Sequence, residues 1–517
     1  MRAMLLIALL VGCPGRFDSP SDSPPADSEP TTDDTADSGG DPLPAEDVDG
    51  DGFFAPEDCN DLDPLIHPDA LDVINGADDN CDGARDVQLL SGVHTKLVGE
   101  HDGDWAGASV AGLGDVNADG FADIGVGAWY EPTNGRNAGA AYVLLGPVER
   151  GTYSLVYSDV KFVGEAMGDT LSRLEGAGDM DGDGVGDLLL CAQYEDTAGR
   201  DAGAAYLVLG PPEGPWDLAD AEAKILAEAA GDGLMRAMRG GDLDADGFPD
   251  LLIGCPGDDT AGSGAGAAYV LTGPISGALS LADAHAKLIG QAGGDTSGAF
   301  LAAPGDMDGD GHDDVVVGDH NGSHGGSHRG SAYLIRGPVP AGAGTLLDTA
   351  SAVFYGSVDD AQAGKVAEAG DLDGDGDTDW LTAAFGDHGA RTYLFDGALN
   401  GEIAGRDAFA VVALEVADAV GVGDLDADGY DDLLVGDELG SYLLFGPLLG
   451  GDLAEADVDV FLPAEEEDDD AGFRVAAAGD TDADGCADLL IGARHEDMGG
   501  DDAGAAYLVL GSPRAAR

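Results

Sequence analysis

One nine-residue segment occurs seven times in this chain, and it constrains the possible folds more than any other feature. Its pattern is Asp-x-Asn/Asp-x-Asp-Gly-x-x-Asp, a glycine precedes every copy, and an apolar run follows. The copies begin at Asp115, Asp179, Asp242, Asp306, Asp371, Asp424 and Asp480, which are 64, 63, 64, 65, 53 and 56 residues apart. Such a regular period indicates an array of similar structural repeats.

Each repeat contains four short runs that are typical of β-strands. In the first copy they are 96–99, 108–114, 123–128 and 140–145, and Gly, Asp and Asn-rich turns separate them. Four short strands per repeat, in seven repeats, predict an all-β fold, namely a seven-bladed β-propeller. The alternative is a solenoid, which would need capping repeats that we do not find in the sequence.

The strand order within a repeat predicts how the ring closes. A strand similar to 96–99 precedes each Asp segment, whereas the last repeat ends just after 507–511. We therefore expect 96–99 to pair with 505–510, so that both ends of the repeat region share one blade. This pairing removes the exposed sheet edges that promote aggregation.

The Asp segments place oxygen atoms at alternate positions of a tight loop. In the second copy, Asp179, Asp181, Asp183 and Asp187 stand at positions 1, 3, 5 and 9, and Val185 offers its carbonyl at position 7. A flexible, highly charged cage of oxygen ligands favours Ca²⁺ over Mg²⁺ and over thiophilic metals. The alternative is a set of solvated Asp turns that hold no metal.

The seven segments together predict about seven calcium sites. Asn117 stands at position 3 of the first copy, so we expect this site to have the lowest charge and a lower affinity. In chain order, the predicted ligands of the seven copies are Asp115, Asn117, Asp119, Phe121, Asp123; Asp179, Asp181, Asp183, Val185, Asp187; Asp242, Asp244, Asp246, Phe248, Asp250; Asp306, Asp308, Asp310, His312, Asp314; Asp371, Asp373, Asp375, Asp377, Asp379; Asp424, Asp426, Asp428, Tyr430, Asp432; and Asp480, Asp482, Asp484, Cys486, Asp488.

The Asp segment combined with a Gly-Ala-Ala-Tyr-Val-Leu-x-Gly-Pro strand resembles the FG-GAP repeat of the integrin α-subunit propeller. The resemblance covers about 96–512. It implies that the calcium hairpins lie on one face of the propeller and the ligand-binding loops on the other. The Phe-Gly element of the family is weak here, since its nearest equivalents are Trp105-Ala106-Gly107 and Ala471-Gly472-Phe473.

By this resemblance, the loops after the second strand of each repeat form a candidate ligand face. Its candidate residues are Trp129, Tyr130, Tyr194, His320, His324 and His328. Exposed Trp and Tyr side chains are frequent anchors of binding interfaces, but an aromatic ring in such a loop can also pack on a neighbouring blade. The three histidines recur at every fourth position, which raises transition-metal binding as a further possibility.

A small module precedes the repeats, at 46–85. Asp47, Asp49, Asp51 and Asp58 have the spacing of an EF-hand loop with the Phe53 carbonyl at its seventh position, which predicts at least one more calcium ion. Cys59 and Cys81 are most simply a disulfide in an exported protein. The segment 46–83 resembles the metal-binding motif found in many secreted bacterial proteins.

The N-terminus has the features of an export signal. A short apolar stretch within 1–12 has the size of a signal-peptide core, and Leu10-Val11-Gly12-Cys13 resembles the lipobox of bacterial lipoproteins, in which the cysteine is acylated. The alternative is an ordinary signal peptide with a chance cysteine. Residues 13–45 are rich in Asp, Ser and Pro and are predicted to form a disordered linker.

Charge and motifs narrow the possible functions. The chain of 517 residues has 22 Lys+Arg against 101 Asp+Glu, a formal net charge of −79, which disfavours nucleic acid as a partner. The sequence lacks the nucleophile-elbow, zinc-protease, P-loop and dinucleotide fingerprints. We therefore expect a binding protein and not an enzyme.

The expected biological setting follows from these features. We expect a calcium-stabilised propeller for extracellular ligand binding or adhesion, with a protein or glycan as its ligand. It would be held at the cell envelope by its lipid anchor, on the outer membrane or surface of a Gram-negative bacterium. The alternative is an envelope hydrolase or lyase whose site lies at the mouth of the propeller channel.

Overall fold

The fold is that of a computed structural model of the chain. The structure describes Phe53, 59–60, 66–68, Cys81, 90–212, 214–323, 326–386, 389–397, 399–466 and 468–512. The predictions made for 1–12 and 13–45 lie outside the described residues, as do Cys13, Asp47, Asp49, Asp51, Asp58 and His324.

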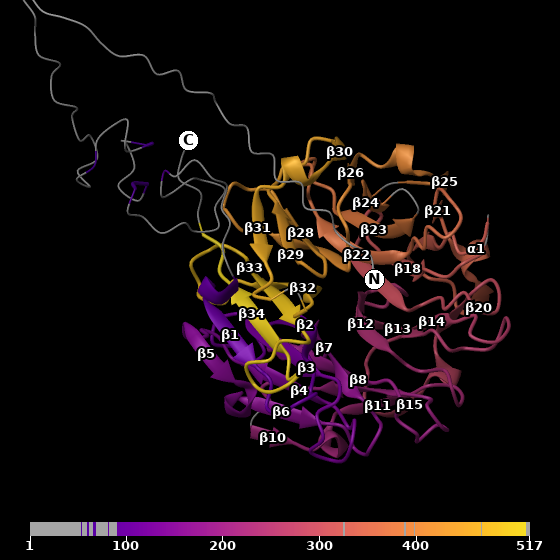
Figure 1. The fold of residues 1–517 in the computed structure, drawn as a ribbon. Coiled ribbons are helices and arrows are strands. Elements are labelled where there is room, and N and C mark those ends of the chain that lie inside the picture. Colours follow the sequence, from indigo (N-terminus) through magenta and orange to yellow (C-terminus); the bar gives the residue numbers. More distant parts are fainter. Residues whose placement is uncertain are drawn as a thin grey trace, which may run out of the picture. The chain divides into compact units, whose positions relative to one another are not determined.

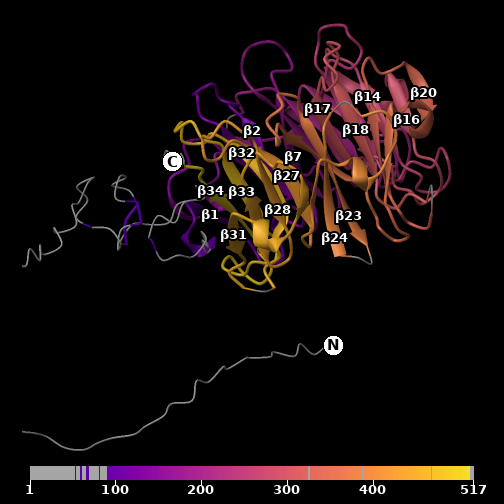
Figure 2. The same cartoon turned by 90° about the horizontal axis from the view of Figure 1, so that it is seen from above.

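Within the described residues, seven β-sheets follow one another around a closed ring, which confirms the predicted seven-bladed propeller (Figure 1). The innermost strands are β2 (Ala106–Gly114), β7 (Leu171–Gly178), β12 (Arg236–Gly241), β17 (Phe300–Gly305), β22 (Lys365–Gly370), β27 (Asp418–Gly423) and β32 (Ala471–Gly479). Each of them contacts the innermost strand of the next sheet, and β32 contacts β2, which completes the ring. Figure 2 shows β2 and β32 beside each other. We name each sheet after its innermost strand.

Three further strands continue each sheet outward in antiparallel order. The second strands are β3 (Asp123–Ala128), β8 (Asp187–Ala192), β13 (Asp250–Cys255), β18 (Asp314–Asp319), β23 (Asp379–Gly386), β28 (Asp432–Gly436) and β33 (Asp488–Ala493). The third strands are β4 (Ala140–Leu144), β9 (Ala204–Val208), β14 (Ala267–Leu271), β19 (Ser331–Ile335), β24 (Gly389–Phe395), β29 (Gly440–Leu444) and β34 (Ala505–Val509). The fourth strands are β6 (Val160–Val163), β11 (Ala223–Leu226), β16 (Ala286–Ile289), β21 (Ala352–Tyr355), β26 (Ala410–Val412), β31 (Val460–Pro463) and β1 (Thr95–Val98).

The ring closes through the pairing of β1 with β34. Lys96 lies opposite Tyr507 and Val98 opposite Ala505 in an antiparallel register. In Figure 1 the indigo strand β1 and the yellow strand β34 lie side by side, although they come from opposite ends of the repeat region. The predicted pairing of 96–99 with 505–510 is therefore confirmed.

A fifth, outermost strand was not predicted. It is parallel to the fourth strand in six of the seven described sheets, so the expectation of four strands holds only for the β27 sheet. These strands are β5 (Gly151–Ser154), β10 (Gly214–Trp216), β15 (Gly277–Ser280), β20 (Gly342–Thr345), β25 (Gly401–Ile403) and β30 (Gly451–Leu453). Each is only three or four residues long and begins with glycine, so it leaves no pattern of alternating apolar residues in the sequence.

The fifth strand connects neighbouring sheets. β5 follows β4 of the β2 sheet, but it pairs with β1 of the β32 sheet. The chain then turns back through a short helix to form β6, the fourth strand of the sheet it had left. Each fifth strand therefore joins two neighbouring sheets by backbone hydrogen bonds.

The apolar core lies between the sheets. Leu189 and Leu207 of the β7 sheet pack with Leu251 and Ile253 of the β12 sheet, and comparable clusters fill the other junctions. Small residues let the innermost strands approach closely, since a Cβ atom on Gly112 would lie 2.4 Å from the carbonyl oxygen of the neighbouring strand. The innermost strands of all seven sheets line a central cavity of about 300 Å³.

Helices are limited to single turns in the described chain. They are the 3₁₀-helices η1 (Leu90–Gly92), η2 (Leu155–Tyr157), η3 (Leu218–Asp220), η4 (Leu281–Asp283), η5 (Gly405–Asp407) and η6 (Glu455–Asp457), and the α-helix α1 (Leu346–Thr349). None of the described helices has the length and apolar character that crossing a bilayer requires.

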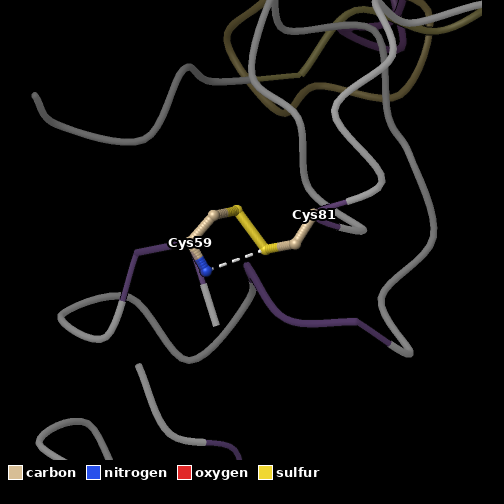
Figure 3. Close-up of a disulfide and its surroundings, with 2 residues drawn as sticks. All are labelled: Cys59 and Cys81. Atoms are coloured by element: carbon tan, nitrogen blue, oxygen red, sulfur yellow. Dashed lines mark hydrogen bonds between the residues drawn. A yellow bond between two sulfur atoms is a disulfide. The ribbon is translucent and has the colours of Figure 1, made fainter. Parts of the chain in front are cut away.

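The predicted disulfide of the N-terminal module is present. Cys59 and Cys81 are joined through their sulfur atoms, and the Cys59 amide donates a hydrogen bond to Cys81 Sγ at 3.0 Å (Figure 3). The ring of Phe53 stacks on His67 at a centroid distance of 4.9 Å. The predicted acidic ligands of this module lie outside the described residues.

Candidate metal centres and the opposite loop face

The seven Asp segments are hairpins at the same end of the ring. Each connects the innermost strand to the second strand, and its last aspartate is the first residue of that second strand. Because the seven sheets share one strand order and direction, the hairpins all point to one face of the propeller. We call this the hairpin face, and we call the other end of the ring the loop face.

Backbone amides hold the hairpin carboxylates in place. In the second hairpin, Asp179 accepts hydrogen bonds from the amides of Asp183 at 3.1 Å and Gly184 at 2.8 Å. Gly184 has a φ of 90°, a conformation that side chains rarely adopt, so a glycine is needed at this turn. The position-5 carboxylate of Asp183 in turn accepts from the Val185 amide at 2.8 Å. These bonds shape the loop around a common centre.

The bond from the position-7 amide to the position-5 carboxylate recurs in all seven hairpins. Its length lies between 2.8 and 3.1 Å, and its donors are Phe121, Val185, Phe248, His312, Asp377, Tyr430 and Cys486. The side chain of Cys486 is buried and outside any disulfide, as are those of Cys191 and Cys255. The predicted position-7 residues therefore occupy equivalent places, whatever their side chains.

The last aspartate of each hairpin is buried, and in every hairpin except that of Asp379 it accepts hydrogen bonds from two backbone amides. Asp187 accepts hydrogen bonds from the Met180 amide at 2.7 Å and from the Gly210 amide at 2.9 Å. A carboxylate has about four lone-pair sites, so such an aspartate can still bind a cation. In the first hairpin, the Asn117 side-chain Nδ2 donates to the Asp119 carboxylate at 2.9 Å and so takes part in the same loop.

The residues fit a divalent cation. Carboxylate oxygens of Asp179, Asp181 and Asp187 all lie within 4.8 Å of one another. The same holds for the three sets Asp242, Asp244 and Asp246; Asp306, Asp308 and Asp314; and Asp371, Asp373 and Asp379. Buried oxygens of Asp244 and Asp379 have no hydrogen-bond partner. Oxygen-only donor sets of this charge suit a hard cation.

Burial raises the pKa of the last hairpin aspartate. The pKa is raised to about 6 at Asp123, Asp314 and Asp488, and to about 8 at Asp379 and Asp432, chiefly because burial penalises the charged form. Nearby hairpin carboxylates add repulsion in the same direction. A bound cation would supply the missing positive charge.

Comparison with known protein families agrees with this geometry. Residues 236–271 and 471–509 match the FG-GAP repeat family, and residues 306–382 match the FG-GAP-like repeat family. The chain carries FG-GAP repeats. Residues 58–86 match the family described as "Putative metal-binding motif", a match that includes Cys59 and Cys81 but not the predicted ligands between Asp47 and Phe53.

Relatives of this FG-GAP propeller include integrin α subunits. Integrin alpha-PS2 of Drosophila melanogaster is 32% identical over 177 residues, which is 32% of this chain and 12% of that protein. Integrin alpha-IIb of Homo sapiens is 33% identical over 185 residues, which is 33% of this chain and 17% of that protein. The chain therefore matches less than 20% of the length of these curated relatives.

Among solved structures, one of BBS1N in complex with ARL6DN, soaked with lead, aligns with this FG-GAP propeller. The alignment covers 84% of this chain and 99% of that chain, with 10% identity and a TM-score of 0.46.

The loop face brings together three of the predicted ligand-face residues. Trp129 and Tyr130 follow β3, Tyr194 follows β8, and all three line one pocket. His320 and His328 contact different partners, since His320 lies edge-on to Phe300 at 5.4 Å and His328 pairs with Asp360 at 3.3 Å. The third histidine of the predicted set, His324, is outside the described residues.

A lysine network that recurs in four sheets was not predicted from the sequence. On four sheets a fourth-strand lysine faces a third-strand tyrosine, in the pairs Lys96–Tyr507, Lys161–Tyr142, Lys224–Tyr206 and Lys287–Tyr269. Each ammonium also contacts two carboxylates; Lys161, for example, lies 2.9 Å from Glu100 and 3.0 Å from Glu131. The available signal was a Lys-x-x-x-Glu spacing at 96–100, 161–165 and 224–228.

Proposed function

We propose that this FG-GAP propeller is stabilised by calcium, is anchored to the cell envelope through a lipidated Cys13, and binds an extracellular protein or glycan with its loop face. The observation that carries the proposal is the recurrence of one carboxylate hairpin at the same end of all seven described sheets. A binding role, and not catalysis, is also supported by the similarity to integrin α subunits.

The hairpin residues have a defined role in this proposal. The carboxylates at positions 1, 3, 5 and 9 and the carbonyl at position 7 would hold each ion. Calcium supplies positive charge where several carboxylates crowd together, in a chain whose formal net charge is −79. Because the ion binds only the assembled hairpin, binding favours the folded state by mass action.

Thermal melting tests the calcium part of the proposal. We expect the melting temperature in calcium to exceed that in EDTA by at least about 10 °C, since several sites each add binding free energy. Magnesium should give a smaller shift because it demands stricter octahedral geometry. An identical melting curve in calcium and in EDTA would refute the calcium role.

Two further measurements test the setting and the binding role. Mass spectrometry of the membrane fraction should find a diacylglyceryl-modified Cys13 as the mature terminus, whereas an intact Met1 would refute lipid anchoring. An array of glycans and extracellular proteins, probed with the calcium-loaded chain, should show capture that EDTA abolishes. Capture of none of them would count against an adhesive or ligand-binding role.

A further inference from the structure

A small pocket on the loop face has a composition that is unusual for this chain. Its volume is about 100 Å³, and its lining includes Trp129, Tyr130, Arg173, Gln193, Tyr194 and Met235. These residues come from the loops after β3 and β8, from β7, and from the segment before β12. None of the lining residues is acidic, although the chain contains 101 Asp and Glu residues.

The guanidinium group of Arg173 has no partner in the described chain. It makes neither a hydrogen bond nor an ion pair there, and its carboxylate neighbour Glu175 pairs with Arg236 at 3.3 Å. Arg173 also lines the central cavity, where Arg474 pairs with Asp418 at 3.6 Å. Burial, with Arg474 and Arg236 nearby, lowers the pKa of Arg173 to about 9. No carboxylate in the described chain therefore pairs with the positive charge of Arg173.

Trp129, which also lines the pocket, carries a second unsatisfied donor. The indole nitrogen Nε1 of Trp129 is buried and has no hydrogen-bond partner. The Trp129 and Phe473 rings lie nearly perpendicular to each other, with their centroids 6.4 Å apart. An unpaired buried donor is unfavourable, so binding of an acceptor that reaches it is favoured. Two lining residues of one pocket thus carry unpaired donors, which favours an anionic acceptor.

The other lining residues of the pocket indicate which kind of ligand carries the negative charge. Tyr130 and Tyr194 contribute aromatic rings, and Tyr194 is 42% exposed at the rim. Gln193 and Thr170 add neutral polar groups that suit hydroxyls. Aromatic rings beside neutral hydrogen-bonding groups offer a surface for the apolar face of a sugar ring. The volume of about 100 Å³ suits the carboxylate end of one sugar unit and is too small for a folded segment.

We propose that this pocket binds the carboxylate of an acidic sugar, with Arg173 and the Trp129 N–H as its donors and the Tyr130 and Tyr194 rings against the sugar. The assignment rests on the proposed function, because it names the ligand class of the same loop face. A uronate carries one negative charge per unit. It therefore meets the two donors without bringing the dense charge of a sulfated or phosphorylated polymer toward an acidic protein.

The test is a titration of the full, calcium-loaded chain, followed by calorimetry or saturation-transfer NMR. The probes are D-glucuronate, neutral D-glucose, N-acetylglutamate and inorganic sulfate. We expect glucuronate to bind saturably and glucose to bind at least about tenfold more weakly, because hydrogen bonds that involve a charged group are stronger than those between neutral groups. Tighter binding of N-acetylglutamate or sulfate than of glucuronate would overturn the acidic-sugar assignment.

Three variants assign the donors. Arg173→Met should weaken glucuronate binding by at least about tenfold, and Trp129→Phe, which keeps a ring but removes the N–H group, should weaken it several-fold. Arg200→Met is the matched control, because the Arg200 side chain is 87% exposed and the change in net charge is the same. Equal binding by all three variants, or loss with Arg200→Met as well, would overturn the proposal.

The outcome separates this inference from the proposed function. If the array shows calcium-dependent capture that Arg173→Met leaves intact, the loop face binds ligands elsewhere and only the pocket assignment fails. If neither the array nor glucuronate shows binding, the proposed function fails with it.

Discussion

Lys96 on β1 donates a hydrogen bond of 2.7 Å to Glu496, a residue 400 positions further along the chain. The same ammonium donates to Glu465 at 2.8 Å and lies over the Tyr507 ring at 5.2 Å from its centroid. The strand pairing that closes the ring is thus accompanied by a charge network between the two ends of the repeat region. Both parts of the closure depend on one short strand.

Substitution of Lys96 should destabilise the closed ring. The side chains of Lys96 and Glu496 are each only 6% exposed, so Lys96→Met leaves a buried carboxylate without its partner. We expect the free energy of unfolding to fall by about 3 kcal/mol, measured by urea denaturation in calcium. The double variant Lys96→Met/Glu496→Gln removes the uncompensated charge and should recover part of this loss. Equal stability of the single and double variants would contradict the prediction.

The calcium affinity of single hairpins should follow their charge. Asn117→Asp adds a carboxylate to the first hairpin and should strengthen its calcium binding by about tenfold, whereas Asp181→Asn should weaken the second hairpin by a similar factor. Calorimetric titration with calcium measures both. Asp220→Asn, in the exposed turn η3, makes the same charge change away from the hairpins and should leave the titration unaltered. An equal effect of Asp220→Asn would assign the change to overall charge.

Without metal, acidification should stabilise the propeller. The folded-state pKa is raised to about 8 at Asp379 and Asp432 and to about 6 at Asp123, from an ordinary value of 3.8. The folded state therefore binds these protons more tightly than the unfolded chain, and stability rises as pH falls from about 8 toward 6.

Urea denaturation at the two pH values measures this effect. In EDTA, the free energy of unfolding should be at least about 1 kcal/mol higher at pH 6 than at pH 8. In saturating calcium the slope should reverse, because protons then compete with the ion for the carboxylates. A higher stability at pH 8 in EDTA would contradict the prediction.

The carboxyl group of Asp319 should destabilise the fold at neutral pH. The side chain is fully buried at the end of β18, neither of its oxygens has a hydrogen-bond partner, and burial raises its pKa well above the ordinary value. Asp319→Asn removes the buried charge and should raise the free energy of unfolding by about 1 kcal/mol or more at pH 8. The gain should vanish at low pH, where Asp319 is protonated in the parent protein.

Asp258 provides the matched comparison for Asp319. It is also buried, but it lies 2.8 Å from the Lys287 ammonium, so its negative charge is compensated. Asp258→Asn should therefore destabilise the protein at pH 8, in the opposite direction to Asp319→Asn. Denaturation curves that shift in the same direction for both variants would show that pairing with lysine does not decide the outcome.

The hairpins were predictable because their information is local. All five predicted ligand positions of a hairpin, such as Asp179 to Asp187, lie within nine consecutive residues, so their spacing alone places the oxygens together. The closure by β1 was predictable for a related reason, since an unpaired strand at one end and a missing strand at the other complete one repeat. The fifth strands were missed because residues such as Gly151 and Gly342 carry no strand-forming pattern.

By itself, the sequence determined the number of repeats, the strands of each sheet except the outermost, and the carboxylate positions of the hairpins, because these depend on neighbours within one repeat. Only the tertiary structure decided which charges meet. Lys161 reaches Glu100 across 61 positions, and Arg173 remains without a carboxylate although Glu175 is two residues away. Such pairings depend on which strands from different repeats lie side by side, and on which cation reaches a shared carboxylate. The local spacing of residues in the sequence determines neither of these.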